Sequence, residues 1–305
     1  MTPPPIEHDA WSAWVLEQRH GSNAAYGARL QRQLNEIRDR VLDGAALAPG
    51  MTLADIGCGD GLIGFGAIDR VGRDLTVIFS DISEPLLKHT VDIAVERQLM
   101  EQCRFVRSSA ESLAIIPAAS VDAVTSRAVL AYLPQKVVAL GEFWRILKPG
   151  GVLSIADPIF QDSALLLAAV GNGLRAGTLG SATAKLEMLH RWRSRQMPAT
   201  IEKINAHPLT RFTERDLVRY AQRAGFVDIH LRLHIDVIPA TPIPWDALLA
   251  SAPFPGAPTL ADVLASDFNP AERNAFEEAF RASFEAGEPI EQNTLAYLVA
   301  RKPPA

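Results

Sequence analysis

A glycine-rich stretch with two aspartates, LADIGCGDGLIGFGA, occupies residues 53–67. Gly57, Gly59 and Gly61 carry no side chain, so the backbone at these positions can approach a ligand closely. The apolar residues before them are typical of a buried strand, and open parallel sheets bind cofactors at the carboxyl ends of their strands. The stretch therefore predicts a loop that holds a cofactor.

Two interpretations of this loop differ in the charge of the cofactor. Gly59, Gly61 and Gly64 match the G-x-G-x-x-G pattern of loops that hold a dinucleotide pyrophosphate. The carboxylates of Asp55 and Asp60 would repel a pyrophosphate. They would attract a cofactor that carries a sulfonium and an ammonium group, because both groups are positive. The loop therefore favours a positively charged cofactor, and an NAD-dependent oxidoreductase is the less favoured alternative.

Strand and helix patterns alternate around the loop. Ser83 is expected to cap one of the helices, with Pro85 in its first turn. The alternation is typical of βαβ units, so we predict an α/β fold with a parallel sheet covered by helices on both faces. The expected strands are 51–56, 75–81, 103–109, 120–126 and 152–157, and the expected helices between them are 62–72, 83–100 and 135–147.

Later in the chain, Thr213 and Asp216 have the spacing of a helix capping box. After that helix, apolar and polar residues alternate strictly over 229–237. A period of two predicts a strand with one wetter face, and hence antiparallel placement at a sheet edge. A last strand is expected at 293–301.

Other segments lack this alternation and are rich in helical signals. Apolar spacing predicts an amphipathic helix from Asn23 to Leu42, with Gly44 as its stop. These patterns divide the chain into a core and additions. We expect an N-terminal helical extension or lid at 1–44, helical cap insertions at 159–207 and 241–290, and a cofactor-binding core at 45–158, 208–240 and 291–305.

Composition and charge narrow the class of partner. The net charge is −5 and no cluster of lysine and arginine occurs, which argues against nucleic acid or an anionic membrane and favours a small molecule. The start does not resemble a signal peptide, no apolar run reaches membrane-spanning length, and cysteines are few, so we expect a cytoplasmic protein. His207, His230 and His234 lack companions at metal-ligand spacing, so no metal is expected. Apolar stretches in the insertions could form a substrate pocket or the interface of a homodimer.

Three motifs resemble those of a known family. They are DIGCGDG at 55–61, Asp81 at the end of VIFSD, and LKPGGVLSIAD at 147–157. With them the chain resembles the class I S-adenosylmethionine-dependent methyltransferases. The resemblance implies a Rossmann-like, seven-stranded, mostly parallel sheet whose last strand is antiparallel. It also implies methyl transfer to oxygen, nitrogen or carbon of a small organic molecule. It covers residues 45–160 and, more loosely, 210–238 and 293–301.

The resemblance further implies roles for residues around S-adenosylmethionine as the cofactor. Asp55 and the glycine loop would hold its methionine part, Asp81 would accept hydrogen bonds from both ribose hydroxyls, and Ile82 would pack on the adenine. Where the family often has an aspartate near the adenine amino group, this chain has Ser109, so that contact falls to Ser109, Glu111 or backbone. The full set is Asp55, Gly57, Cys58, Gly59, Asp60, Gly61, Asp81, Ile82, Ser109, Ala110, Glu111, Ser126 and Arg127.

Methyl transfer is an in-line displacement that needs a held nucleophile and the exclusion of water. Asp157 is a candidate catalytic residue at the end of the fifth strand, or else it caps the segment that follows. Arg127 could pair with an anionic substrate group or with a carboxylate of the cap. His20 ends a segment that could fold over the cofactor, or else it lies on the surface. Cys58 is a candidate thiol nucleophile or, as we favour, a small filler of the loop.

One further alternative shares every cofactor motif. A protein that binds S-adenosylmethionine without transferring the methyl group, as a regulatory subunit or a rearrangement catalyst, would have the same loop. Formation of S-adenosylhomocysteine would distinguish a methyltransferase from such a protein.

Overall fold

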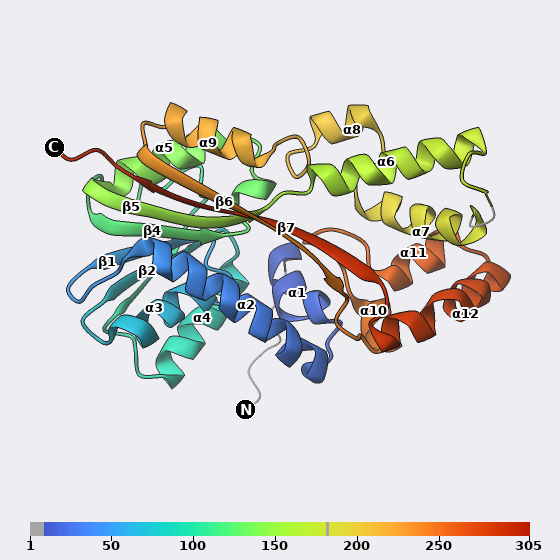
Figure 1. Cartoon of the computed structure of the whole chain (residues 1–305). Helices are drawn as coiled ribbons and strands as arrows, with labels where there is room; N and C mark the ends of the chain where they lie inside the picture. The colour runs from blue at the N-terminus through green and yellow to red at the C-terminus, as the bar shows by residue number, and fades with distance from the viewer. Residues whose placement is uncertain (1–8, 181–182) are drawn as a thin grey trace.

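One sheet of seven strands organises the part of the chain that this computed structural model describes, residues 9–180 and 183–305. The strands are β1 (Thr52–Ile56), β2 (Thr76–Asp81), β3 (Cys103–Arg107), β4 (Val121–Arg127), β5 (Leu147–Pro158), β6 (Val227–Pro239) and β7 (Ile290–Arg301). Their order is β3-β2-β1-β4-β5-β7-β6 (Figure 1). Neighbours from β3 to β5 are parallel, and β7 is antiparallel to both β5 and β6. The expected Rossmann-like sheet with an antiparallel last strand is confirmed.

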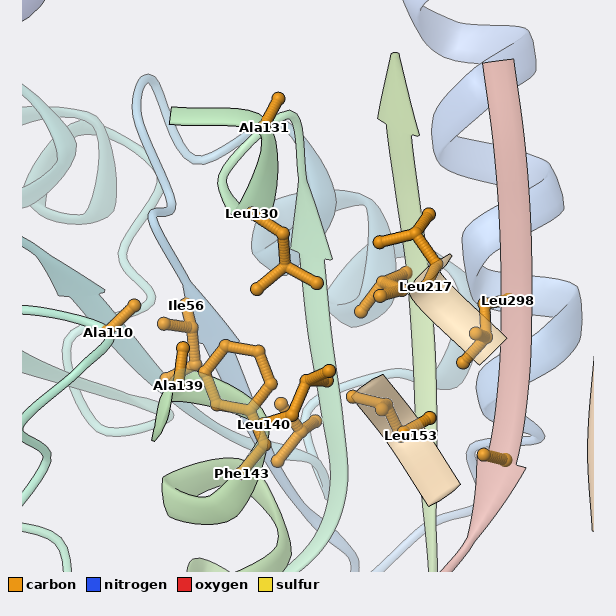
Figure 2. Close-up of a cluster of buried hydrophobic side chains, with 14 of the residues drawn as sticks. Ile56, Ala110, Leu130, Ala131, Ala139, Leu140, Phe143, Leu153, Leu217 and Leu298 are labelled. Atoms are coloured by element: carbon orange, nitrogen blue, oxygen red, sulfur yellow. The ribbon is translucent and has the colours of Figure 1, made fainter. Parts of the chain in front are cut away.

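Helices cover both faces of the sheet (Figure 1). One face carries α2 (Ala24–Ala45), α3 (Leu62–Val71) and α4 (Glu84–Glu96), and the other carries α5 (Lys136–Ile146) and α9 (Glu214–Arg223). In Figure 2, Leu140 and Phe143 of α5 and Leu217 of α9 lie in one buried cluster with Ile56 and Leu153 of the sheet. Such burial of apolar side chains is the main driving force for folding.

The helix starts follow the local signals in the sequence. The Ser83 hydroxyl accepts a hydrogen bond from the Leu86 amide, and Pro85 lies in the first turn of α4. Thr213 and Asp216 form the reciprocal capping box that their spacing predicts. Each cap satisfies backbone amides that have no partner within their own helix.

Gly44 does not stop α2, contrary to our expectation, because the helix continues to Ala45. A Cβ atom on Gly44 would lie 2.4 Å from Ser154 Oγ and 2.6 Å from a methyl carbon of Val299. The glycine therefore lets α2 approach β5 and β7 closely. The helix ends one residue later, where Ala46 adopts a left-handed backbone conformation with φ of 49°.

The two helical additions pack against each other beside the sheet (Figure 1). Trp192 from the first addition contacts Phe276 from the second, with ring centroids 5.8 Å apart. The Arg191 guanidinium pairs with Glu272 at 2.9 Å and lies over the Phe268 ring. The helices are α6 (Gln161–Ala176), α7 (Thr183–Gln196) and α8 (Ile201–Ala206) in the first addition, and α10 (Trp245–Ala250), α11 (Leu260–Asp267) and α12 (Pro270–Ala286) in the second.

The N-terminal segment lies between the sheet and these additions (Figure 1). It comprises α1 (Ala10–Leu16) and a short 3-10 helix, η1 (Gln18–His20). The Trp14 indole donates a hydrogen bond of 2.9 Å to the carbonyl of Ala252, in the second addition. The segment MTPPP lies outside the described residues, and no described helix is long and apolar enough to cross a membrane.

Candidate functional site

The glycine loop follows β1 directly, and buried hydrogen bonds hold it in place. One oxygen of Asp55 accepts a hydrogen bond from the Gly64 amide in the first turn of α3, and the other accepts one from the Thr125 hydroxyl of β4. Burial raises the pKa of Asp55 to about 7. Asp55 therefore fixes β1, β4 and α3 relative to one another, directly beneath the loop.

Asp81, at the end of β2, holds the loop from the other side. Its two oxygens accept hydrogen bonds from the amides of Gly59 and Ser83, each 2.9 Å long. Burial raises the pKa of Asp81, and these hydrogen bonds oppose that shift. Each carboxylate oxygen has a second lone pair, so Asp81 can still accept hydrogen bonds from a ligand.

The glycines of the loop meet two different requirements. Gly57 has φ of 67°, and a Cβ there would lie 2.2 Å from a methyl carbon of Val129. Gly59 has φ of 57°, and nothing lies within 4 Å of the position that its Cβ would take. Gly57 is thus required by the packing of the protein, whereas Gly59 faces open space that a ligand can occupy.

Beyond the loop, β4 and β5 end in polar groups that lack partners. Ser126 Oγ and Asp157 Oδ2 are buried and make no hydrogen bond among the described residues. The Arg127 guanidinium makes no hydrogen bond or ion pair in this part of the chain, and burial and the nearby charge of Arg19 lower its pKa, which the charge of Asp60 opposes. An unpaired buried polar group is costly, so these atoms are places where a bound molecule would be stabilised.

The N-terminal segment reaches the loop through a salt bridge that the sequence analysis did not identify. Arg19 of η1 pairs with Asp60 of the loop at 3.0 Å. Next to Arg19, His20 lines a hollow of about 440 Å³ between η1 and α2. His20 Nδ1 is buried without a hydrogen-bond partner among the described residues. His20 therefore lies beside the loop and faces a space of ligand size.

Comparison with known proteins identifies the family. The model of a family described as "Methyltransferase domain" matches residues 54–155. The nocamycin O-methyltransferase of Saccharothrix syringae is 32% identical over 202 residues, which cover 66% of this chain and 68% of that protein. The chain belongs to the class I S-adenosylmethionine-dependent methyltransferase family.

Two further comparisons give a second relative by sequence and a solved structure with the same fold as this methyltransferase. The 27-O-demethylrifamycin SV methyltransferase of Amycolatopsis mediterranei is 26% identical over 222 residues, covering 71% of this chain and 79% of that protein. The crystal structure of the YcgJ protein from Bacillus subtilis aligns with a TM-score of 0.52 at 17% identity, covering 88% of this chain and 99% of that one. The latter shows a shared fold and no more.

Asp157 of the methyltransferase is enclosed. Its side chain has no exposed surface, and its Oδ1 accepts a hydrogen bond from the Ala131 amide of η2 (Leu130–Tyr132). Burial raises the pKa of Asp157 to about 7, although the charges of Lys136 and Arg127 oppose that shift. Asp157 thus holds η2 beside the end of β4, which is not the segment that follows Asp157 in the chain.

Three of the residues expected near the adenine lie in the loop after β3, and the fourth follows β2. The Ser109 hydroxyl accepts a hydrogen bond from the Glu111 amide, and the Glu111 carboxylate accepts one from the Gln135 amide. Ala110 is buried in the core beneath them. Ile82 is 53% exposed at the end of β2, where a flat apolar group could pack on it. Their contacts with a cofactor stay predictions.

Cys58 does not have the environment of a nucleophile in this methyltransferase. It is buried, and burial together with the charges of Asp81, Asp55 and Asp60 raises its pKa. A thiol attacks as the thiolate, which these surroundings disfavour. The structure thus favours the role of a small filler.

Tyr132 and Lys136 have the Tyr-x-x-x-Lys spacing that some nicotinamide-dependent oxidoreductases use for hydride transfer. The structure separates their roles. Lys136 Nζ donates to the carbonyls of Leu133 and Pro208 and lies over the Phe212 ring, whereas the Tyr132 ring packs edge-on against Trp11. The pair therefore connects loops of the methyltransferase and gives no support to the oxidoreductase alternative.

Proposed function

We propose that this enzyme uses S-adenosylmethionine to methylate a hydroxyl oxygen of a small organic molecule. The observation that carries the proposal is the hollow of about 440 Å³ between η1 and α2, because one of its lining residues, Arg19, pairs with Asp60 of the glycine loop. Its volume lies within the range of small-molecule sites, and apolar residues of α2, Leu30 and Leu34 among them, form part of its wall. Two relatives whose names state methylation of an oxygen support this choice of atom.

The residues around the loop fit the cofactor. Gly59 leaves open space over the loop, Asp81 retains lone pairs for hydroxyl donors, and Ile82 offers an exposed apolar side chain at the end of the same strand. When bound, S-adenosylmethionine supplies a methyl group on a positively charged sulfur. Asp81 adds negative charge beside the loop, which favours a positive ligand, whereas Arg19 offsets the charge of Asp60.

A hydroxyl acceptor must lose its proton when the oxygen–carbon bond forms. His20 lines the hollow, and its Nδ1 has no hydrogen-bond partner among the described residues, so we assign the proton to His20 rather than to Asp157, which is enclosed and holds η2. Arg127, with no partner among the described residues, is available to orient a polar or anionic group of the acceptor. The N-terminal segment, which bonds to both the loop and the second addition, would exclude water.

The proposal also assigns a cell compartment to the enzyme and a lid and a cap to segments of the chain. Cys58 and Cys103 are both free, which suits the reducing cytoplasm. We assign residues 1–44 to a lid, and 159–207 and 241–290 to a cap over the acceptor. The contact of Trp14 with Ala252 supports this arrangement because it joins the lid to the cap.

The test is turnover with a panel of small hydroxyl, amine and activated-carbon compounds. S-Adenosylhomocysteine and product mass are followed by mass spectrometry. We expect S-adenosylhomocysteine and a product heavier by one CH₂ with hydroxyl compounds. His20→Gln should lower kcat by about 100-fold, since general base catalysis is worth that much or more, and should leave S-adenosylhomocysteine binding intact. His230→Gln, an exposed histidine of β6, is the matched control.

Two results would contradict the proposal. Turnover restricted to amines or carbon acceptors would reject oxygen as the methylated atom. Tight S-adenosylhomocysteine binding with no turnover of any compound would favour a protein that binds the cofactor without transferring its methyl group.

A further inference from the structure

The strand at one edge of the sheet, β6, has no neighbouring strand along its outer side within residues 9–180 and 183–305. The order of strands places β6 beyond β7, and β7 and α9 are the elements that pack on it most extensively among the described residues. The strand is 13 residues long. An edge strand presents unpaired N–H and C=O groups in a row, so it can pair with another strand.

Beyond the cover of α9, the apolar face of β6 is exposed to solvent. Ile229 and Leu231 pack against the core, but Leu233, Ile235 and Val237 are 37%, 51% and 63% exposed. These three side chains alternate along one face, as the period of a strand requires. Their exposure has no counterpart in the parallel part of the sheet, where helices cover the strands.

Two of the usual protections of an edge, a bulge and a proline, are confined to the ends of β6. The pairing with β7 shifts register between Val227 and His230, and Pro239 ends the strand. Between these points the sequence HLRLHIDVI contains no proline, glycine or lysine. Residues 230–238 therefore form an uninterrupted edge that is open to pairing.

The polar face of β6 carries two opposite charges without partners. Arg232 and Asp236 are exposed, lie four residues apart, and make no ion pair or side-chain hydrogen bond among the described residues. The ring of His234, between them, contacts the Arg40 guanidinium of α2. Two residues of opposite charge on one face of a strand can pair with a copy of the same strand that runs antiparallel.

We propose that β6 pairs antiparallel with β6 of a second copy of this chain, which joins the two sheets across a two-fold axis at His234. This register places Arg232 opposite Asp236 of the second copy, and Asp236 opposite its Arg232. It also places Leu233 opposite Ile235 and Leu231 opposite Val237, so the exposed apolar face becomes continuous. A shift of two residues in either direction leaves Arg232 without an opposing carboxylate.

The occupant is a second copy because the strand complements itself. Opposite charges directly across two strands stabilise pairing, and like charges oppose it. The symmetry of the proposed register forms the same pair twice, as a two-fold interface requires. The chain has a net charge of −5, which disfavours association in general, so attraction depends on these local contacts.

The test is the oligomeric state of the full chain, measured by sedimentation equilibrium. We expect a dimer. Arg232→Asp and Asp236→Arg should each raise the dimer dissociation constant by about tenfold or more, because each places like charges opposite one another. The double variant, Arg232→Asp with Asp236→Arg, should return the dissociation constant to near its original value. Arg104→Asp, on the exposed face of β3 at the other edge, is the matched control.

A monomer at all concentrations would overturn the proposal. So would a dimer whose dissociation constant is unchanged by both single variants, since another surface would then form it. Circular dichroism and S-adenosylhomocysteine binding establish that each variant is folded. This inference is independent of the acceptor and of the methyl-transfer step.

Discussion

The two halves of the carboxyl edge of the sheet differ in whether their polar groups have hydrogen-bond partners within the protein. At β1 and β2, both oxygens of Asp55 and both oxygens of Asp81 accept hydrogen bonds from the protein. At β4 and β5, Ser126 Oγ and Asp157 Oδ2 are buried without partners in the described part of the chain. Arg127 lies at the tip of β4 with no partner there either.

The difference indicates which half of the edge binds the cofactor and which half binds the acceptor. A half that is already bonded holds its shape without a ligand, which lowers the cost of ordering when the cofactor binds. Polar atoms left unpaired carry a cost in the free protein that a bound molecule can remove. We infer that β1 and β2 serve the cofactor, which is constant, and that β4, β5 and the N-terminal segment serve the acceptor.

The largest expected effect tests whether the bonded half depends on close packing. Gly57→Ala should lower the free energy of unfolding by roughly 3 kcal/mol, because the left-handed backbone and the contact with Val129 both oppose a Cβ. Gly59→Ala should cost about 1–2 kcal/mol, because its Cβ would meet nothing. Urea unfolding measures both. Equal losses for the two variants would contradict the distinction between packing and open space.

The next effect tests whether Asp81 serves both the loop and the ligand. Asp81→Asn should weaken S-adenosylhomocysteine binding by roughly 10- to 100-fold, since an amide offers one acceptor oxygen where two backbone amides now donate. Calorimetry measures this affinity, and Asp92→Asn, exposed on α4, is the control. Unchanged affinity, or binding of NAD in its place, would reject the assignment of this half to the cofactor.

The last effect concerns the pH dependence of stability at the unpaired half. Burial raises the pKa of Asp157 to about 7, so the folded protein holds this proton more tightly than the unfolded chain does. Stability should therefore fall as pH rises between about 4 and 7. Asp157→Asn should reduce this slope by about 1 kcal/mol per pH unit. Urea unfolding across this range checks it, and an unchanged slope would mean that Asp157 is already ionised at low pH.

Local signals in the sequence predicted much of the fold. Ser83 and the Thr213–Asp216 pair cap their helices as expected, because a cap depends on residues three positions apart. The same local reasoning was wrong at Gly44, where contacts with Ser154 and Val299 explain the glycine. Those contacts join residues that are distant in the chain, and no local pattern reveals them.

In the candidate site, too, local spacing predicted some residues, whereas contacts between distant segments were missed. The spacing of Asp55, Asp81 and the glycines was enough to recognise the family, because these residues belong to the ends of successive strands and the loop between them. The salt bridge between Arg19 and Asp60 was missed, since it joins segments separated by 41 residues. One signal could have predicted this salt bridge: Asp60 lies among glycines without a basic neighbour in the loop, and the N-terminal segment contains Arg19.

By itself, the sequence determined the family, the cofactor loop and the α/β sheet, since each follows from short-range spacing and from the periodicity of burial. The tertiary structure decided which polar groups are paired and which stay free: Asp55 and Asp81 are bonded, whereas Ser126, Arg127 and one oxygen of Asp157 are not. It also decided that the apolar face of β6 extends past its covering helix. The physical reason is that pairing and burial depend on the whole packed chain, whereas propensity and motif spacing depend on neighbours in sequence.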